Sequence, residues 1–136
     1  MKDKIFIDSN IFLYAFNDDD IDKQKLASQT IMSENNNYYI SLQVINEVSS
    51  NMLRKLKFTN IEIKDFINDS YHRYNVLDIT QDIFLLACNI RDQYNISYYD
   101  SLIVSSAINS KCDILYSEDM QHNQIIEDLT IVNPFK

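Results

Sequence analysis

The segment KIFIDSNIF, residues 4–12, decides the fold. Residues 5–7 are apolar, β-branched or aromatic, and do not alternate with polar residues, which predicts a short, fully buried strand. Asp8 follows at its carboxyl end, where open α/β sheets bind their ligands. A buried carboxylate must be paired or bind a metal, whereas Asp and Asn after a strand also serve as turn or N-cap residues. Both interpretations of Asp8 remain open at this point.

Apolar strands and amphipathic helices alternate along the rest of the chain. This alternation predicts an α/β fold with three layers (α/β/α), in which helices cover both faces of a central, twisted, mainly parallel sheet of four to five short strands. A length of 136 residues fits a single domain spanning residues 1–136. The strands are expected at residues 5–7, 38–40, 76–79, 113–116 and 130–132, and the helices at 10–16, 22–35, 41–57, 59–74, 80–95 and 100–110.

Composition narrows the function classes. The chain contains no glycine, which excludes P-loop and dinucleotide-binding fingerprints. It has no apolar run long enough to span a bilayer and no signal-peptide pattern, so we expect a cytoplasmic protein with no membrane partner. Cys88 and Cys112 fit no metal or redox spacing and are expected to be reduced core residues.

A net charge of −8 has the wrong sign for a nucleic-acid-binding protein. The difficulty is smaller if several acids hold a divalent cation, because the ion then dominates the local field. The only dense basic cluster is Arg54, Lys55 and Lys57, at the end of the predicted helix 41–57. These cations either complement the helix dipole or contact phosphate.

Three further acids occupy positions comparable to that of Asp8. Asp119 comes just after the predicted strand 113–116, Asp100 begins an apolar helix, and Glu47 lies beside the apolar stripe of the helix 41–57. A purely structural alternative exists for two of them: Ser97 and Asp100 have the spacing of a capping box, and Glu47 has that of an ordinary surface glutamate.

If these carboxylates converge at one edge of the sheet, they repel one another unless a cation lies among them. Hard oxygen ligands of this kind select Mg²⁺ or Mn²⁺. The corresponding chemistry is phosphodiester hydrolysis, which needs no histidine, cysteine or glycine loop.

Four segments in this order and spacing resemble the PIN-domain family, and within it the VapC-type toxin ribonucleases of toxin–antitoxin systems. The resemblance covers nearly the whole chain. The segments are FIDSNI at residues 6–11, VINEV at 44–48, ISYYDSLI at 96–103 and LYSEDMQH at 115–122.

The resemblance implies a Mg²⁺- or Mn²⁺-dependent endoribonuclease that cleaves RNA. Asp8, Asp100 and Asp119 would bind metal, and Glu47 would hold a second ion or orient the attacking water. Supporting positions, expected to donate or accept hydrogen bonds around the site, fall on Asn10, Ser117 and Glu118. Many relatives have Asn at the position of Glu118, which is therefore either a further ligand or only a neighbour.

The family also implies partners: a cognate antitoxin whose basic C-terminal segment would lie across the acidic groove, and a homodimer, for which the helices between residues 59 and 94 offer apolar surface. Alternatives are a catalytically silent PIN-fold RNA-binding or RNA-processing factor and a phosphoacceptor-type signalling domain. The latter needs a Lys where Ser117, Glu118 and Asp119 stand. A haloacid-dehalogenase-like phosphatase would need Asp in place of Asn10.

Overall fold

The structure, a computed structural model, describes residues 3–34 and 37–136. Within them one six-stranded sheet has the order β3-β2-β1-β4-β6-β5. All neighbouring strands are parallel except β5 and β6. The strands are β1 (Lys4–Ile7), β2 (Asn37–Ser41), β3 (Asn75–Leu77), β4 (Ile114–Tyr116), β5 (Ile125–Ile126) and β6 (Leu129–Val132). The helices are α1 (Ser9–Ala15), α2 (Ile21–Met32), α3 (Leu42–Arg54), α4 (Asn60–Arg73), α5 (Gln81–Gln93) and α6 (Tyr98–Asn109).

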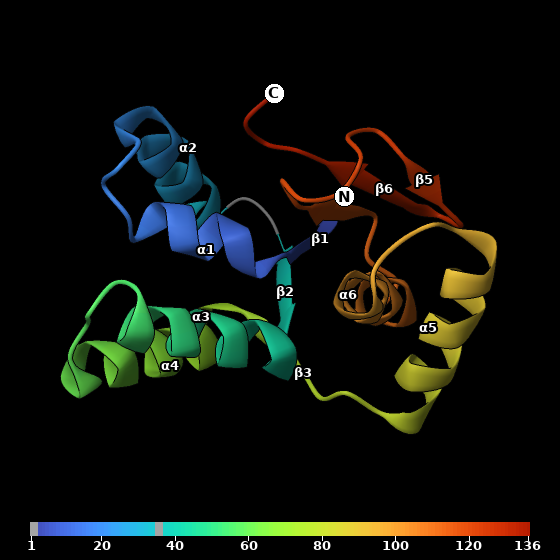
Figure 1. Ribbon diagram of the computed structural model, residues 1–136, viewed down its shortest axis with the longest axis horizontal. Helices are drawn as coiled ribbons and strands as arrows, with labels where there is room; N and C mark the ends of the chain where they lie inside the picture. Colours follow the sequence, from blue (N-terminus) through green and yellow to red (C-terminus); the bar gives the residue numbers. More distant parts are fainter. Residues whose placement is uncertain (1–2, 35–36) are drawn as a thin grey trace.

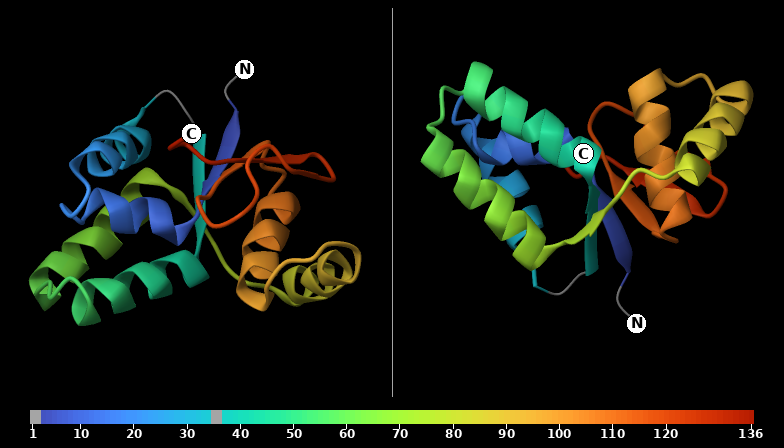
Figure 2. Two further views of the ribbon diagram at one scale, coloured as in Figure 1. Left: turned by 45° about the horizontal axis from the view of Figure 1, so that its top comes forward. Right: turned by 90° about the horizontal axis from the view of Figure 1, so that it is seen from below.

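The helices form two layers, one on each side of the sheet. Helices α1 to α4 lie on one side of β1 and β2, and α5 and α6 lie on the other (Figures 1 and 2). The three-layer α/β/α arrangement expected from the sequence is therefore confirmed. Among the described helices, none has the length and apolar character that crossing a bilayer requires.

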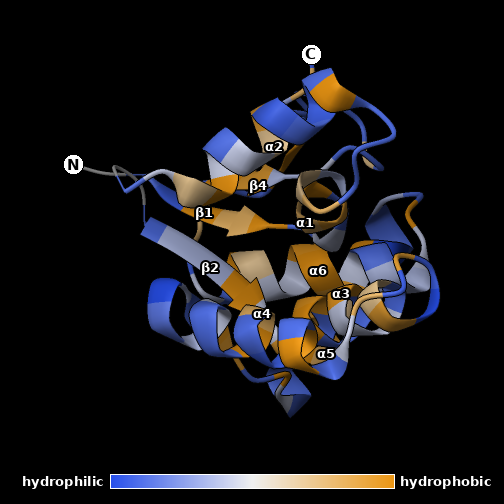
Figure 3. Cartoon of the chain, turned by 90° about the vertical axis from the view of Figure 1, so that its left-hand side faces the viewer, coloured by the Kyte–Doolittle hydropathy of each residue, from blue (hydrophilic) through white to orange (hydrophobic). Residues whose placement is uncertain are grey.

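The core lies between β1, β4 and the helices on both sides. Phe6 and Ile7 are fully buried in β1, as expected for a central parallel strand without polar alternation. Residues 101–107 of α6 are all buried, because α6 packs between the sheet and α5. In the hydropathy view, β1, β4 and α6 are mostly orange, whereas α2 is largely blue or white (Figure 3).

Helix boundaries follow local capping. Thr59 and Glu62 form the expected capping box at the start of α4, and Thr80 accepts a hydrogen bond from the backbone of Ile83 in α5. These N-caps satisfy backbone N–H groups that have no partner within the helix. Helix α2 ends at Met32, before the predicted end at residue 35, which lies outside the described residues.

Beyond small shifts of helix and strand ends, two features differ from the sequence-based expectation. The sheet has one strand more than the four to five predicted, because residues 125–126 form β5 and pair with β6 in a hairpin. Glu127, at φ 54°, makes the turn between them, and a two-residue strand is too short for a periodic signal. Cys88 is exposed on α5 rather than in the core, whereas Cys112 is buried as expected.

Candidate metal centre

The candidate site lies where the chain leaves β1 and β4. These two strands are parallel neighbours at the centre of the sheet, with Ile7 paired to Tyr116. From β1 the chain proceeds to β2 on one side, and from β4 it proceeds to β5 and β6 on the other. Loops that diverge in this way leave a crevice at the carboxyl ends of the strands, the usual ligand position in open α/β sheets.

Asp8 is fixed in this crevice by both strands. Its backbone N–H donates to the carbonyl oxygen of Tyr116 at 3.0 Å. Its carboxylate accepts hydrogen bonds from the Ser9 backbone at 2.8 Å and from the Ser117 hydroxyl at 2.9 Å. Asp8 is therefore also the N-cap of α1, so the capping interpretation is correct without excluding a ligand role.

The environment of Asp8 disfavours its negative charge. The residue is only 4% exposed. Burial is the main reason why the pKa of Asp8 rises to about 7, and the carboxylates of Asp100 and Glu47 add to the effect, while the bonds from Ser117 and Ser9 oppose it. The ionised form of a buried acid with this pKa is unfavourable unless a cation compensates its negative charge.

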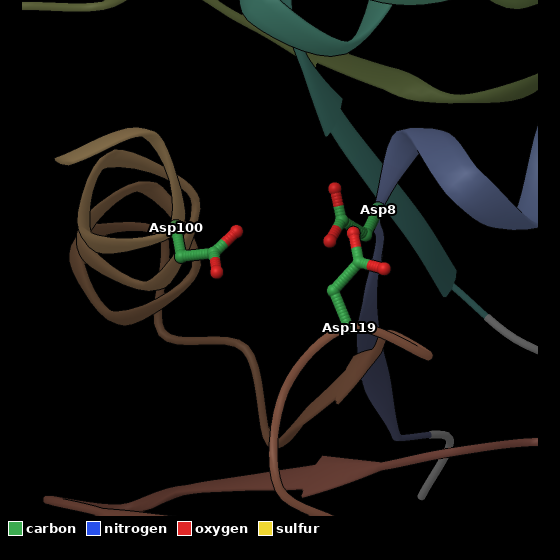
Figure 4. A group of neighbouring side chains, drawn as sticks. All are labelled: Asp8, Asp100 and Asp119. Carbon is green, nitrogen blue, oxygen red and sulfur yellow. The ribbon is translucent and has the colours of Figure 1, made fainter. Parts of the chain in front are cut away.

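Asp100 and Asp119 complete a group of three carboxylates with Asp8. One oxygen atom from each of the three lies within 4.8 Å of the others. They come from separate elements, the end of β1, the first turn of α6 and the loop after β4, and their side chains point toward a common space (Figure 4). Burial raises the pKa of Asp100, and the charges of Asp119 and Glu47 raise it further.

Local hydrogen bonds explain why Asp100 takes this position. Ser97 caps α6 by accepting the backbone N–H of Asp100 at 3.2 Å. This bond begins the helix at a defined residue, so Asp100 falls in its first turn. The helix dipole also stabilises an acid at this end.

Glu47 lies beside the three-carboxylate group and is joined to it through other side chains. One carboxylate oxygen accepts from the Ser9 hydroxyl at 2.7 Å, and the other accepts from the Gln43 amide at 3.0 Å. The same Gln43 amide donates to the carbonyl oxygen of Tyr99 at 3.3 Å. Gln43 thus links α3 to the residue that precedes Asp100.

Ser9 and Gln43 were not among the site residues predicted from sequence. For Gln43 a signal existed, since residues four apart on a helix are neighbours and Gln43 precedes Glu47 by four positions. The orientation of its amide follows from its partners: a carboxylate and a carbonyl both accept, so the nitrogen faces them.

The predicted supporting residues have different roles. Ser117 donates to the Asp8 carboxylate, as expected. Asn10 instead accepts the backbone N–H of Glu118 at 3.3 Å through its side-chain oxygen, and its amide nitrogen is buried without a partner among the described residues. Asn10 therefore positions the loop after β4 rather than a carboxylate.

Glu118 is directed away from the three-carboxylate group. Its carboxylate accepts the Tyr14 hydroxyl at 2.5 Å and forms an ion pair with Lys23 of α2. Burial raises the pKa of Glu118, but the hydrogen bonds from Lys23 and Tyr14 outweigh burial, and the pKa is lowered overall. Its contacts make Glu118 a neighbour that anchors the loop carrying Asp119.

The donor set fits a small divalent cation. Carboxylate oxygens are the ligands that Mg²⁺ and Mn²⁺ prefer, and the raised pKa values of Asp8 and Asp100 show how poorly the group tolerates its charges by itself. A cation among them would relieve both burial and mutual repulsion. The arrangement is thus an acidic centre at the switch point of an α/β sheet.

Comparison with known proteins identifies the family. The PIN domain family model matches residues 5–127. The chain therefore belongs to the PIN domain family. No curated protein sequence matches the chain.

Solved structures with the same fold come from toxin–antitoxin systems. The chain is similar to a chain in the structure of a toxin–antitoxin complex from Klebsiella pneumoniae, with 19% identity and a TM-score of 0.71. The match covers 96% of this chain and 97% of the Klebsiella pneumoniae chain. It is also similar to VapC20 of Mycobacterium tuberculosis, a sarcin–ricin loop-cleaving toxin, with 18% identity, a TM-score of 0.68, and coverage of 83% and 88%. VapBC2 of Rickettsia felis, bound to a promoter DNA fragment, matches with 19% identity, a TM-score of 0.64, and coverage of 94% and 96%.

Proposed function

We propose that this chain is a Mg²⁺- or Mn²⁺-dependent endoribonuclease, the toxin of a type II toxin–antitoxin pair, acting in the cytoplasm. The observation that carries the proposal is the convergence of Asp8, Asp100 and Asp119 to within 4.8 Å at the switch point of the sheet. The similar VapC20 is a toxin that cleaves the sarcin–ricin loop, which supports RNA as the substrate.

The proposal gives each acid a role. Asp8, Asp100 and Asp119 would hold the cation, and a divalent ion bound there would supply Lewis-acid activation of water and stabilisation of the leaving oxygen. Glu47 would hold a second ion or orient the attacking water. Ser9 and Gln43 keep the Glu47 carboxylate oriented, since each of its oxygens accepts one hydrogen bond from them.

A cognate antitoxin is the proposed protein partner. The Klebsiella pneumoniae and Rickettsia felis relatives are toxin–antitoxin assemblies. A net charge of −8 favours a partner with a basic C-terminal segment that covers the acidic centre. A homodimer is also proposed, and the exposed Phe84 and Leu85 on α5 offer apolar surface for it. Helix α4 lies on the other side of β1 and β2 from α5 (Figure 1).

Cleavage of total cellular RNA by the purified chain tests the proposal. The reactions contain Mg²⁺, Mn²⁺ or a chelator, with Asp100→Asn alongside. We expect discrete fragments that require metal and are lost in the variant. Fragments that persist with chelator, or full activity of Asp100→Asn, would contradict the site assignment. If no RNA is cut, calorimetric titration with Mn²⁺ distinguishes two explanations. A nuclease with a narrow RNA specificity should bind Mn²⁺, whereas a catalytically silent domain binds no ion at this site.

A further inference from the structure

A groove of about 250 Å³ opens directly beside the metal centre, and Asp119 belongs to both. Its walls are α1 and the second half of α3, and the loop after β4 completes it. The lining residues are Asn10, Leu13, Tyr14, Asn17, Asn51, Lys55, Leu56, Glu118 and Asp119.

The α3 wall leads away from the acidic centre along one helix face. Glu47, Asn51 and Lys55 are four residues apart in succession, so they project on the same side of the helix. The Asn51 amide donates to the carbonyl oxygen of Glu47 at 2.8 Å, and the Lys55 backbone N–H donates to Asn51 at 2.8 Å, so the helical spacing extends to Lys55. At 1.5 Å per residue, Lys55 lies about 12 Å from Glu47 along the axis.

Lys55 is the available positive charge in this groove. It is exposed, and among the described residues its side chain has no hydrogen bond or ion pair. Apart from Asp119, the acid in the groove lining is Glu118, and its charge is already paired with Lys23. The polar lining also includes three asparagine side chains, whose amides both donate and accept hydrogen bonds.

The structure also separates the three basic residues that the sequence placed together. The Arg54 guanidinium donates to the Ser50 hydroxyl, one turn back on α3. Lys57 adopts a φ of 59° in the turn that leads to α4, and it does not line the groove. Lys55 is therefore the member of the cluster that faces the metal centre's groove.

We propose that this groove binds the sugar–phosphate backbone of an unpaired RNA strand next to the cleavage point, with Lys55 contacting a phosphate that neighbours the scissile one. The inference rests on the proposed nuclease function and adds a subsite and a strand conformation to it. A volume of about 250 Å³ is below the range of roughly 300–1,000 Å³ that drug-sized ligands fill, so the groove has room for about one nucleotide of a single strand.

Binding measurements test this subsite without requiring turnover. A fluorescent, mixed-sequence, single-stranded RNA of 12 nucleotides is titrated with Asp8→Asn protein, and salt is varied. Lys55→Ala is compared with Arg54→Ala, which removes a charge from the same helix end, and with Lys64→Ala on the exposed face of α4. Thermal melting of each variant verifies folding.

We expect Lys55→Ala to lower the affinity about fivefold at low salt and to reduce the slope of log K against log[salt] by about 0.7, the value for one phosphate contact in a single strand. Arg54→Ala and Lys64→Ala should change neither quantity by as much. A role limited to the helix dipole predicts instead that Lys55→Ala and Arg54→Ala lower the melting temperature alike and leave RNA binding unchanged.

The proposal would be overturned if the three variants lowered RNA affinity equally, or if no RNA bound at low salt. It would also be overturned if Lys55→Ala weakened binding of a duplex of the same sequence as much as binding of the single strand. In the active protein, Lys55→Ala should raise KM and leave kcat unchanged, because the contact is remote from the reacting atoms. Metal-dependent cleavage with an unchanged KM in Lys55→Ala refutes the subsite alone. Absence of metal-dependent cleavage together with absence of Mn²⁺ binding at the acidic centre refutes the nuclease function, while the RNA-binding result stands by itself.

Discussion

The carboxylate after β1 and the two carboxylates after β4 follow the same sequence pattern, an apolar strand ending in acid, but their environments differ. Asp8 is buried and bonded to both strand ends, and its pKa is raised to about 7. Asp119 is exposed, and its neighbour Glu118 is held by Lys23 and Tyr14 with a lowered pKa. The central strand β1 therefore ends in an acid, Asp8, whose negative charge is disfavoured by burial. The loop after β4 carries an exposed acid, Asp119, whose position depends on the contacts of its neighbour Glu118.

The largest expected effect is on cleavage after Asp8→Asn. The side chain keeps its shape and can still cap α1, but it loses the charge that a cation requires. Loss of a residue that hydrogen-bonds to a metal ligand typically lowers metal affinity or activity about 10- to 100-fold. Loss of a direct metal ligand should therefore lower the cleavage rate at least about 100-fold. RNA cleavage rates at saturating Mn²⁺ measure the effect, with the exposed Asp92→Asn as control. Retention of wild-type rates would remove Asp8 from the site.

Stability of the metal-free protein should depend on pH through the same residue. The pKa of Asp8 is about 7 in the folded state against an ordinary value of 3.8, so between these values the folded state holds a proton that the unfolded chain has lost. The free energy of unfolding should therefore fall as pH rises from about 4 to 7, by at most roughly 1.4 kcal/mol per pH unit for this one proton. Urea unfolding at several pH values measures it.

Asp8→Asn provides the control for this pH dependence, because all other titrating groups remain. The curve of the variant should be flatter than that of the wild type across the same window. Addition of Mn²⁺ should reverse the trend for the wild type, since the ion binds the deprotonated carboxylates. Parallel curves for the two proteins would show that Asp8 titrates normally.

A smaller effect is expected when the support of Glu47 is removed. Gln43→Met preserves the length of the side chain but removes the hydrogen bonds to Glu47 and to the Tyr99 carbonyl. We expect kcat to fall roughly tenfold, as is typical when a residue that hydrogen-bonds to a site carboxylate is lost. The KM for RNA should be unchanged. Gln29→Met on the exposed face of α2 is the matched control. An unchanged kcat would show that Glu47 is oriented without Gln43.

The smallest effect is predicted for the anchor of the β4 loop. Lys23→Met removes the ion pair with Glu118 but keeps an apolar stem over the Tyr14 ring. Because this pair is partly solvated, the melting temperature should fall only slightly, whereas Mn²⁺ affinity should fall a few-fold as Asp119 loses its fixed position. Calorimetric titration compares the variant with Lys25→Met on the same helix. An identical Mn²⁺ affinity would mean that the loop holds Asp119 without this anchor.

Most of the architecture was predictable because its signals are local. Strand β1 is a run of adjacent apolar residues, and the capping box of Thr59 and Glu62 spans one helical turn. Three of the four candidate acids stand out for the same reason, because Asp8 and Asp119 follow strands and Asp100 lies at the start of a helix. Glu47 stands out only by its place beside the apolar stripe of a helix. The hairpin strand β5 and the exposed position of Cys88 carry no such pattern, and both differ from the sequence-based expectation.

The amino-acid order alone determined where the acids occur and which elements carry them. The tertiary structure decided what those acids experience, because the decisive contacts join residues far apart in the chain: Ser117 donates to Asp8 across 109 positions, and Tyr14 to Glu118 across 104. Burial and hydrogen bonding set a carboxylate's pKa, and both depend on which segments the fold brings together. For that reason Asp8 and Glu118, alike in sequence context, have pKa values shifted in opposite directions.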